Sequence, residues 1–179
     1  EARLPDRRMG LMDVQPTWKG GKLALSGETT LPEAFWTAFE DRADVAFLRG
    51  DPAIVTAPVL NLRREPRHGS ELVSQAPMGT RLHVLKRPEG EWWRVQTPDG
   101  YVAWARSDNM RLEPTLDEGL RTRPVVLAAE RSDGAGSLPL AAGSELRIRE
   151  WRSEGWLALT PLGVEVWVPQ QEAIAPEER

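Results

Sequence analysis

An internal repeat limits the possible folds of this chain more than any other feature of its sequence. Residues 79–84 (GTRLHV) align with residues 143–148 (GSELRI). After a one-residue gap, two tryptophans, a Thr-Pro pair and a glycine recur 63 positions later, and the tryptophans are 11 residues apart in both copies. This agreement predicts two copies of one small domain, at residues 53–112 and 121–174, joined by residues 113–119. The matched positions are Trp93 and Trp156, Thr97-Pro98 and Thr160-Pro161, Gly100 and Gly163, and Trp104 and Trp167.

Each copy consists of short apolar runs separated by turn residues. In the first copy, residues 82–85 precede a Pro-Glu-Gly turn, and residues 93–97 alternate up to Pro98-Asp99-Gly100. This pattern is typical of β-strands joined by tight turns. We expect a barrel of five or six strands, because closing a sheet removes its exposed edges. A domain of about 60 residues buries only about 60% of its unfolded surface. Most of the eight tryptophans are therefore expected to pack in the cores or between the copies.

Residues 1–50 have a different pattern and predict a small ββαβ segment. Residues 11–16 and 22–26 alternate on either side of Lys19-Gly20-Gly21-Lys22, and a Gly-Gly pair between two such runs indicates a hairpin. Thr30 and Glu33 have the spacing of a capping box, and apolar residues at helical spacing follow. The sequence therefore predicts a helix over residues 32–43, capped by Thr30, and then a closing strand over residues 45–48. Residues 175–179 are expected to be a tail or the start of a linker.

Composition excludes several classes of function. The chain has no cysteine, which excludes a thiol nucleophile, disulfides and thiolate metal ligands. His68 and His83 are far apart, and no cluster of potential ligands has the spacing of a metal site, so we expect no metal and no cofactor. The net charge is −4 and the arginines are scattered, so a nucleic-acid partner is not expected. No apolar run approaches the roughly 20 residues of a membrane span, and no stretch has the pattern of a signal peptide.

Several motifs of the first copy carry a resemblance to a known family. They are Asn61-Leu62-Arg63-Arg64-Glu65-Pro66, residues 70–75 (SELVSQ), residues 90–93 (GEWW) and Asp99-Gly100-Tyr101. Together they resemble a bacterial SH3 (SH3b) domain, and more narrowly the first SH3b domain of NlpC/P60 cysteine peptidases. The most similar group is the γ-D-glutamyl-L-diamino acid endopeptidases, also called dipeptidyl-peptidase VI. The resemblance implies a mainly β fold with two SH3b domains in tandem, preceded by the ββαβ segment.

The resemblance also implies what this chain lacks. In that family, a C-terminal papain-like domain carries the catalytic Cys and His, and the chain ends at Arg179, where a linker into such a domain is expected. With no cysteine, the chain itself is not expected to be an enzyme. It is expected to position a peptidoglycan stem peptide or muropeptide for a catalytic domain beyond Arg179. The alternative is a stand-alone tandem SH3b module that binds cell wall or a protein partner. The cell envelope or the exterior is the expected location, with a cytoplasmic recycling role as the alternative.

Two site residues follow from the resemblance. In the family, a Glu and a Tyr of the first SH3b domain help to hold the free amino end of the stem peptide, L-Ala, and the matching positions are Glu65 and Tyr101. A carboxylate attracts an ammonium group by about 4 kcal/mol at 4 Å and an effective dielectric constant of 20, before desolvation is subtracted. A phenol adds a hydrogen bond and an aromatic face for the cation. Tyr101 is the single tyrosine, and Val164 occupies its place in the second copy. The alternative is that Glu65 pairs with Arg63 or Arg67 and that Tyr101 is an ordinary strand residue.

Overall fold

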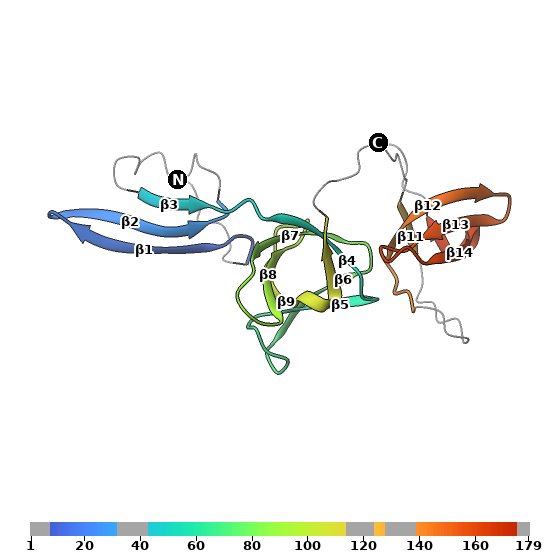
Figure 1. The fold of residues 1–179 in the computed structure, drawn as a ribbon, viewed down its shortest axis with the longest axis horizontal. Coiled ribbons are helices and arrows are strands. Elements are labelled where there is room, and N and C mark those ends of the chain that lie inside the picture. Colours follow the sequence, from blue (N-terminus) through green and yellow to red (C-terminus); the bar gives the residue numbers. More distant parts are fainter. Residues whose placement is uncertain (1–7, 32–42, 114–123, 128–138, 175–179) are drawn as a thin grey trace.

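The chain forms three successive β-sheets in the computed structural model, which describes residues 8–31, 43–113, 124–127 and 139–174 (Figure 1). The fold is mainly β, as the sequence predicts. Within the described ranges, the helical segments are short 3-10 turns, and none is long and apolar enough to cross a membrane.

The N-terminal sheet has three strands in the order β1-β2-β3. β1 (Met12–Lys19) and β2 (Lys22–Thr29) form the predicted antiparallel hairpin, and β3 (Ala43–Phe47) runs parallel to β2. The turn between β1 and β2 needs its two glycines because both have positive φ, +57° at Gly20 and +75° at Gly21.

The predicted helix between β2 and β3 lies almost wholly at residues 32–42, outside the described residues, so the ββαβ arrangement stays a prediction. Thr30, its predicted cap, is described. The Thr30 hydroxyl oxygen accepts a hydrogen bond from the Leu11 amide at 2.9 Å. Thr30 therefore helps to join the end of β2 to the start of β1.

The second sheet has seven strands in the order β10-β4-β7-β8-β9-β5-β6 and curls into a barrel (Figure 1). Its core is formed by buried aliphatic side chains from several strands, among them Val55, Leu60, Leu62 and Val95, which are fully buried. A 3-10 turn, η3 (Ser107–Asn109), connects the last two strands. The strands are β4 (Asp51–Val55), β5 (Val59–Arg63), β6 (Leu72–Pro77), β7 (Arg81–Lys86), β8 (Trp92–Gln96), β9 (Val102–Arg106) and β10 (Met110–Leu112).

The third sheet has five strands in the order β14-β13-β12-β11-β15 and packs around its own hydrophobic core, and it is called the second barrel below. Its core includes Leu140, Leu146, Trp156 and Val168. A second 3-10 turn, η4 (Gln170–Glu172), precedes the last strand. The strands are β11 (Pro124–Leu127), β12 (Glu145–Arg152), β13 (Gly155–Leu159), β14 (Glu165–Pro169) and β15 (Ala173–Ile174).

The repeat read from the sequence is also present in the strand pairing. Trp93 pairs with Ala105 in the first copy, and Trp156 pairs with Val168 in the second. In the turn before β9, the Thr97 amide donates to the Tyr101 carbonyl at 2.9 Å, and the equivalent bond from Thr160 to Val164 has the same length. The segment that connects β11 to Leu140 in the second copy falls at residues 128–138, outside the described part of the chain.

The expectation about tryptophan packing is partly correct. Trp156 is buried, and Trp93 packs against the core of the first barrel. Trp18 and Trp151 do not follow it, because their exposed fractions are 75% and 56%. Trp151 lies edge-on to Trp156, its cross-strand partner, with ring centroids 5.7 Å apart.

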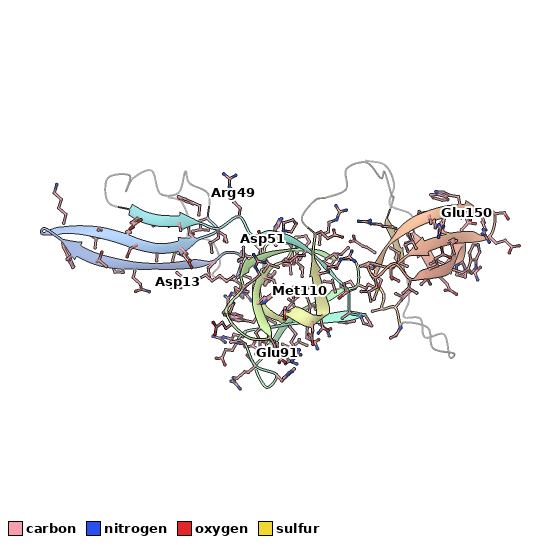
Figure 2. The ribbon with its side chains drawn as sticks, viewed as in Figure 1. Asp13, Arg49, Asp51, Glu91, Met110 and Glu150 are labelled. Carbon is pink, nitrogen blue, oxygen red and sulfur yellow. The ribbon has the colours of Figure 1, made fainter. Side chains whose placement is uncertain are left out.

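The two barrels lie side by side and share a junction (Figure 1). Met78, in the turn between β6 and β7 of the first barrel, is fully buried in the core of the second barrel. The Glu145 amide of β12 donates to the Met78 carbonyl at 2.8 Å. On the other side, the N-terminal sheet adjoins the first barrel, where Lys86 forms ion pairs with Asp13 and Glu28. Figure 2 shows Asp13 at the start of β1, on the side of this barrel.

Candidate functional site

Glu65 lies in the loop between β5 and β6, and buried Ser70 fixes the shape of this loop. The Ser70 hydroxyl oxygen accepts a hydrogen bond from the Glu65 amide at 2.9 Å, and the Ser70 carbonyl accepts one from the Arg63 guanidinium at 2.7 Å. Ser70 is 6% exposed, whereas the Glu65 side chain is 53% exposed. A buried anchor therefore presents the Glu65 carboxylate to solvent.

The Glu65 carboxylate has a neighbouring cation. Arg67 Nε lies 2.8 Å from Glu65 Oε2, so the pairing that the sequence left as an alternative is present. Both side chains are more than half exposed, and exposed ion pairs of this kind are worth about 0.2–1 kcal/mol. A ligand ammonium could replace Arg67 at small cost. The role of Glu65 in holding a ligand stays a prediction.

Tyr101 lies directly before β9, at the end of the turn that is repeated in both barrels. Its carbonyl accepts hydrogen bonds from the Thr97 amide at 2.9 Å and from the Thr97 hydroxyl at 3.2 Å. The Arg8 guanidinium lies over the Tyr101 ring, 6.0 Å from the centroid, and the Arg8 carbonyl accepts the Val102 amide at 2.7 Å. The aromatic face already attracts a cation in this structure.

Strand pairing relates the two candidate residues. Arg63, the last residue of β5, pairs with Trp104 in antiparallel register. The residues that follow Arg63 therefore leave this strand pair at the end where β9 begins, next to Tyr101. In the structure each candidate side chain has its own cation, Arg67 for Glu65 and Arg8 for Tyr101. The proximity of Glu65 to Tyr101 stays a prediction.

Sequence reasoning missed a charged cluster beside the Glu65 loop. His68 lies edge-on to Trp92 with ring centroids 5.2 Å apart, and its Nε2 is 3.4 Å from Arg106 Nη1. Arg106 donates to Glu91 and Asp108, each at 2.6 Å. These hydrogen bonds hold the pKa of Arg106 above its usual range and the pKa of Asp108 below its own. The contact between His68 and Arg106 depends on the cross-strand pairing of Trp92 with Arg106. This pairing could not be predicted from the sequence.

The described residues include no group of three or more His, Asp or Glu side chains that could hold a metal ion. The candidate site thus consists of one exposed carboxylate, one phenol and the cations next to them. Such groups can bind an ammonium group and donate a hydrogen bond. The chain contains no cysteine that could attack a peptide bond.

The strand order and short turns of the first barrel define a small SH3-like β-barrel. Residues 62–109 match the family model described as the bacterial dipeptidyl-peptidase SH3 domain, and these residues are a bacterial SH3 domain. The match includes both Glu65 and Tyr101. No curated protein matches the chain.

One solved structure gives a similar result for the fold. An NlpC/P60 family protein from Bacillus cereus ATCC 10987 superposes with a TM-score of 0.57 at 14% identity, over 69% of this chain and 55% of that one. The chain thus spans about half the length of that protein, and the likeness shows the fold. NlpC2 and NlpC1 from Trichomonas vaginalis each give a TM-score of 0.33 at 10% identity over 73% of this chain, and cover 50% and 47% of those chains.

Proposed function

We propose that this chain is the non-catalytic, substrate-positioning and cell-wall-targeting region of a peptidoglycan γ-D-glutamyl-diamino acid endopeptidase. The observation that carries the proposal is the match of residues 62–109 to the SH3 domain of bacterial dipeptidyl-peptidases. A catalytic NlpC/P60 domain beyond Arg179 would supply the cysteine that this chain lacks. The chain alone should therefore leave muropeptides uncleaved.

In this proposal the first barrel recognises the free amino end of the stem peptide. The L-Ala ammonium group replaces Arg67 at the Glu65 carboxylate, and exchanging one exposed cation for another costs little. The Tyr101 ring, which already accepts the Arg8 cation, offers its face to the same ammonium group. Val164 occupies the Tyr101 position in the second barrel, so that barrel lacks the aromatic partner. Selection for a free amine would then come from one barrel of the two.

A titration followed by NMR tests this role. The ligands are L-Ala-γ-D-Glu-diaminopimelic acid and the same peptide with an acetylated amino group. We expect the free-amine peptide to shift the amide signals of the Glu65 loop and of Tyr101, and the acetylated peptide to leave them in place. Equal shifts with both peptides, or none at millimolar concentrations, would reject amine recognition.

Two loop glutamates provide matched variants. Glu65→Gln keeps the shape but removes the charge, and we expect affinity for the free-amine peptide to fall by about 1–3 kcal/mol. Glu71→Gln is the control, because Glu71 is also exposed in this loop and also pairs with an arginine, Arg64, at 3.2 Å. Equal effects of the two variants would show that loop charge alone matters. If both variants bind intact cell wall as tightly as the natural chain does, the result would favour the stand-alone tethering module.

A further inference from the structure

A cavity of about 230 Å³ lies between the two barrels, apart from Glu65 and Tyr101. Residues of both barrels line it: Arg111 lies in β10, the last strand of the first barrel, Glu113 directly follows this strand, and Arg147 comes from β12 of the second. The turn at residues 159–163, which is the counterpart of the turn before Tyr101, closes one side. The repeated turn therefore faces a different environment in each barrel.

Two guanidinium groups in this cavity converge on one oxygen atom. Arg111 Nη2 and Arg147 Nη2 lie 3.5 and 3.7 Å from the same Glu113 Oε1. Charge-assisted hydrogen bonds are usually about 2.7–2.9 Å long, so both contacts are ion pairs without a short hydrogen bond. Each guanidinium carries five N–H donors, and the described interactions leave most of these donors available.

Two arginines elsewhere in the chain have shorter contacts with their carboxylate partners. Arg106 and Arg152 donate to their carboxylate partners at 2.6 and 3.0 Å, and each of these partners lies two residues away or directly before a neighbouring strand. Arg111 and Arg147 share a single carboxylate, which cannot accept hydrogen bonds from all the donors of both guanidinium groups. A second carboxylate in the cavity would accept hydrogen bonds from donors of both guanidinium groups.

Glu113 is a fixed part of the cavity. Its side chain is only 10% exposed, and its amide donates to the Pro52 carbonyl at 2.9 Å. Burial of an ionised carboxylate is costly unless cations compensate it, and the two arginines provide that charge. Glu113 therefore orients both guanidinium groups towards the cavity and leaves their outer donors to a ligand.

The remaining walls limit the size and polarity of the ligand. Ile54, Leu159 and Leu162 supply apolar surface. The volume of about 230 Å³ is below the roughly 300–1,000 Å³ of pockets for drug-sized ligands. The space fits one small residue with an apolar side chain rather than a long peptide.

Four charged side chains line the cavity, and their charges balance when all of them are ionised. Glu145 also lines it, and burial raises the pKa of the Glu145 carboxyl group, while Arg81 acts on it in the opposite direction. In the neutral form of Glu145, which burial favours, the cations Arg111 and Arg147 exceed the remaining anion Glu113 by one charge. A monovalent carboxylate would neutralise that excess.

We propose that the cavity between the barrels binds the α-carboxylate of a small apolar residue, as a free amino acid or at the end of a short peptide. Arg111 and Arg147 hold the carboxylate, and the apolar wall receives the side chain. This site does not depend on the amine recognition proposed for Glu65 and Tyr101. The second barrel thereby gains a ligand-binding role that its own sequence motif lacks.

Blocked amino acids test this proposal on the full chain. N-acetylalanine carries the carboxylate but no amine, and N-acetylalaninamide lacks both charges, so neither ligand engages an ammonium site. We expect N-acetylalanine to shift the amide signals of Thr160 and Gly163 and the Arg147 side-chain signal, and the amide to leave them unchanged. Equal shifts with acid and amide would overturn the proposal. Shifts from free alanine but not from N-acetylalanine would also overturn it, because they would require an amine.

Matched arginine variants on one strand separate the site from general surface charge. Arg147→Gln should weaken binding of N-acetylalanine about tenfold or more, which is typical for the loss of a charged hydrogen-bond partner. Arg149→Gln is the control, because Arg149 lies on the same strand but pairs with Glu165. If Arg147→Gln disturbs folding, Arg111→Gln removes the other cation from the first barrel. Affinity that is unchanged in a folded Arg147 or Arg111 variant, or lowered equally by Arg149→Gln, would reject the site.

Discussion

Glu145 of the second barrel donates its backbone amide to the carbonyl of Met78 in the first barrel at 2.8 Å. The Met78 side chain is fully buried and belongs to the hydrophobic core of the second barrel. One residue of the first barrel thus completes the core of the next and is hydrogen bonded there through its backbone. This contact couples the two barrels physically, since they cannot separate without exposing Met78.

Replacing Met78 by alanine should destabilise mainly the second barrel, although Met78 belongs to the first barrel in sequence. Truncation of a buried methionine costs about 2–5 kcal/mol, and the cavity would open beside Leu146 and Trp156. Hydrogen exchange should show faster opening of β12 and β13, with smaller changes around Val95 in the first core. Met12→Ala is the control, because Met12 is 40% exposed. Equal loss of protection in both barrels would show that they unfold as one unit.

Gly79→Ala should loosen the junction itself. A Cβ atom on Gly79 would lie 1.9 Å from the Glu145 carbonyl oxygen, and Gly79 has a φ of +87°. Gly90→Ala is the control, since Gly90 also has a positive φ, of +110°, but open space around it. Both variants carry the backbone cost of about 1–2 kcal/mol. Only Gly79→Ala should increase the radius of gyration measured by small-angle scattering, and an unchanged radius would argue against a tight junction.

The two glutamates of β12 should give stability changes of opposite sign with pH. Burial raises the pKa of Glu145 above its unfolded value of 4.5, so the folded state binds the proton more tightly and ionised Glu145 opposes folding at neutral pH. Glu145→Gln should therefore be more stable than the natural chain at pH 7, and this advantage should shrink as the pH falls towards 4.5.

Glu150 provides the opposite case on the same strand. The hydrogen bond from Arg152 lowers the pKa of Glu150, so its contribution to stability is present above the unfolded value of 4.5 and is lost as the pH falls through the folded value. Glu150→Gln should be less stable than the natural chain at pH 7, with a difference that vanishes in acid. Denaturant midpoints measured from pH 7 to pH 3 check both variants, and parallel curves would contradict the assignment.

Thr29→Val should destabilise the N-terminal sheet. Thr29 is fully buried, and its hydroxyl donates to the Leu11 carbonyl at 3.0 Å and accepts from the Leu31 amide at 3.0 Å. Valine keeps the shape but leaves both backbone groups without this partner, at a cost of about 1–3 kcal/mol. Thr17→Val, which removes a longer bond of 3.4 Å to Ala24, should cost less. Thermal unfolding checks the difference, and equal melting temperatures would show that water replaces the hydroxyl.

Local signals in the sequence predicted the parts of the fold that depend on neighbouring residues. The β1–β2 hairpin follows from Gly20-Gly21, because a tight turn needs positive φ there. The repeat follows from the tryptophan spacing, because equal spacing gives equal strand registers. The junction could not be predicted in this way. In the sequence Met78 lies in a turn of the first barrel. The core residues that it contacts belong to the second barrel and reach it only when the two barrels pack together.

The same distinction between local and long-range contacts applies to the candidate site. The pairing of Glu65 with Arg67 is local, and the sequence raised it as an alternative. Arg8 and Tyr101 are far apart in the sequence, and their contact depends on how the N-terminal sheet meets the first barrel. The convergence of Arg111 and Arg147 on Glu113 likewise requires both barrels, so no motif in either copy indicates it.

The most direct test of the proposed function is an intermolecular NOE experiment on the chain with L-Ala-γ-D-Glu-diaminopimelic acid. Because Tyr101 is the single tyrosine, its ring protons can be assigned without ambiguity. Substrate positioning by the first barrel predicts NOEs between the alanine methyl group and the Tyr101 ring, and their loss in Glu65→Gln but not in Glu71→Gln. NOEs from the alanine methyl group that fall only on other residues, or that persist with the acetylated peptide, would contradict it.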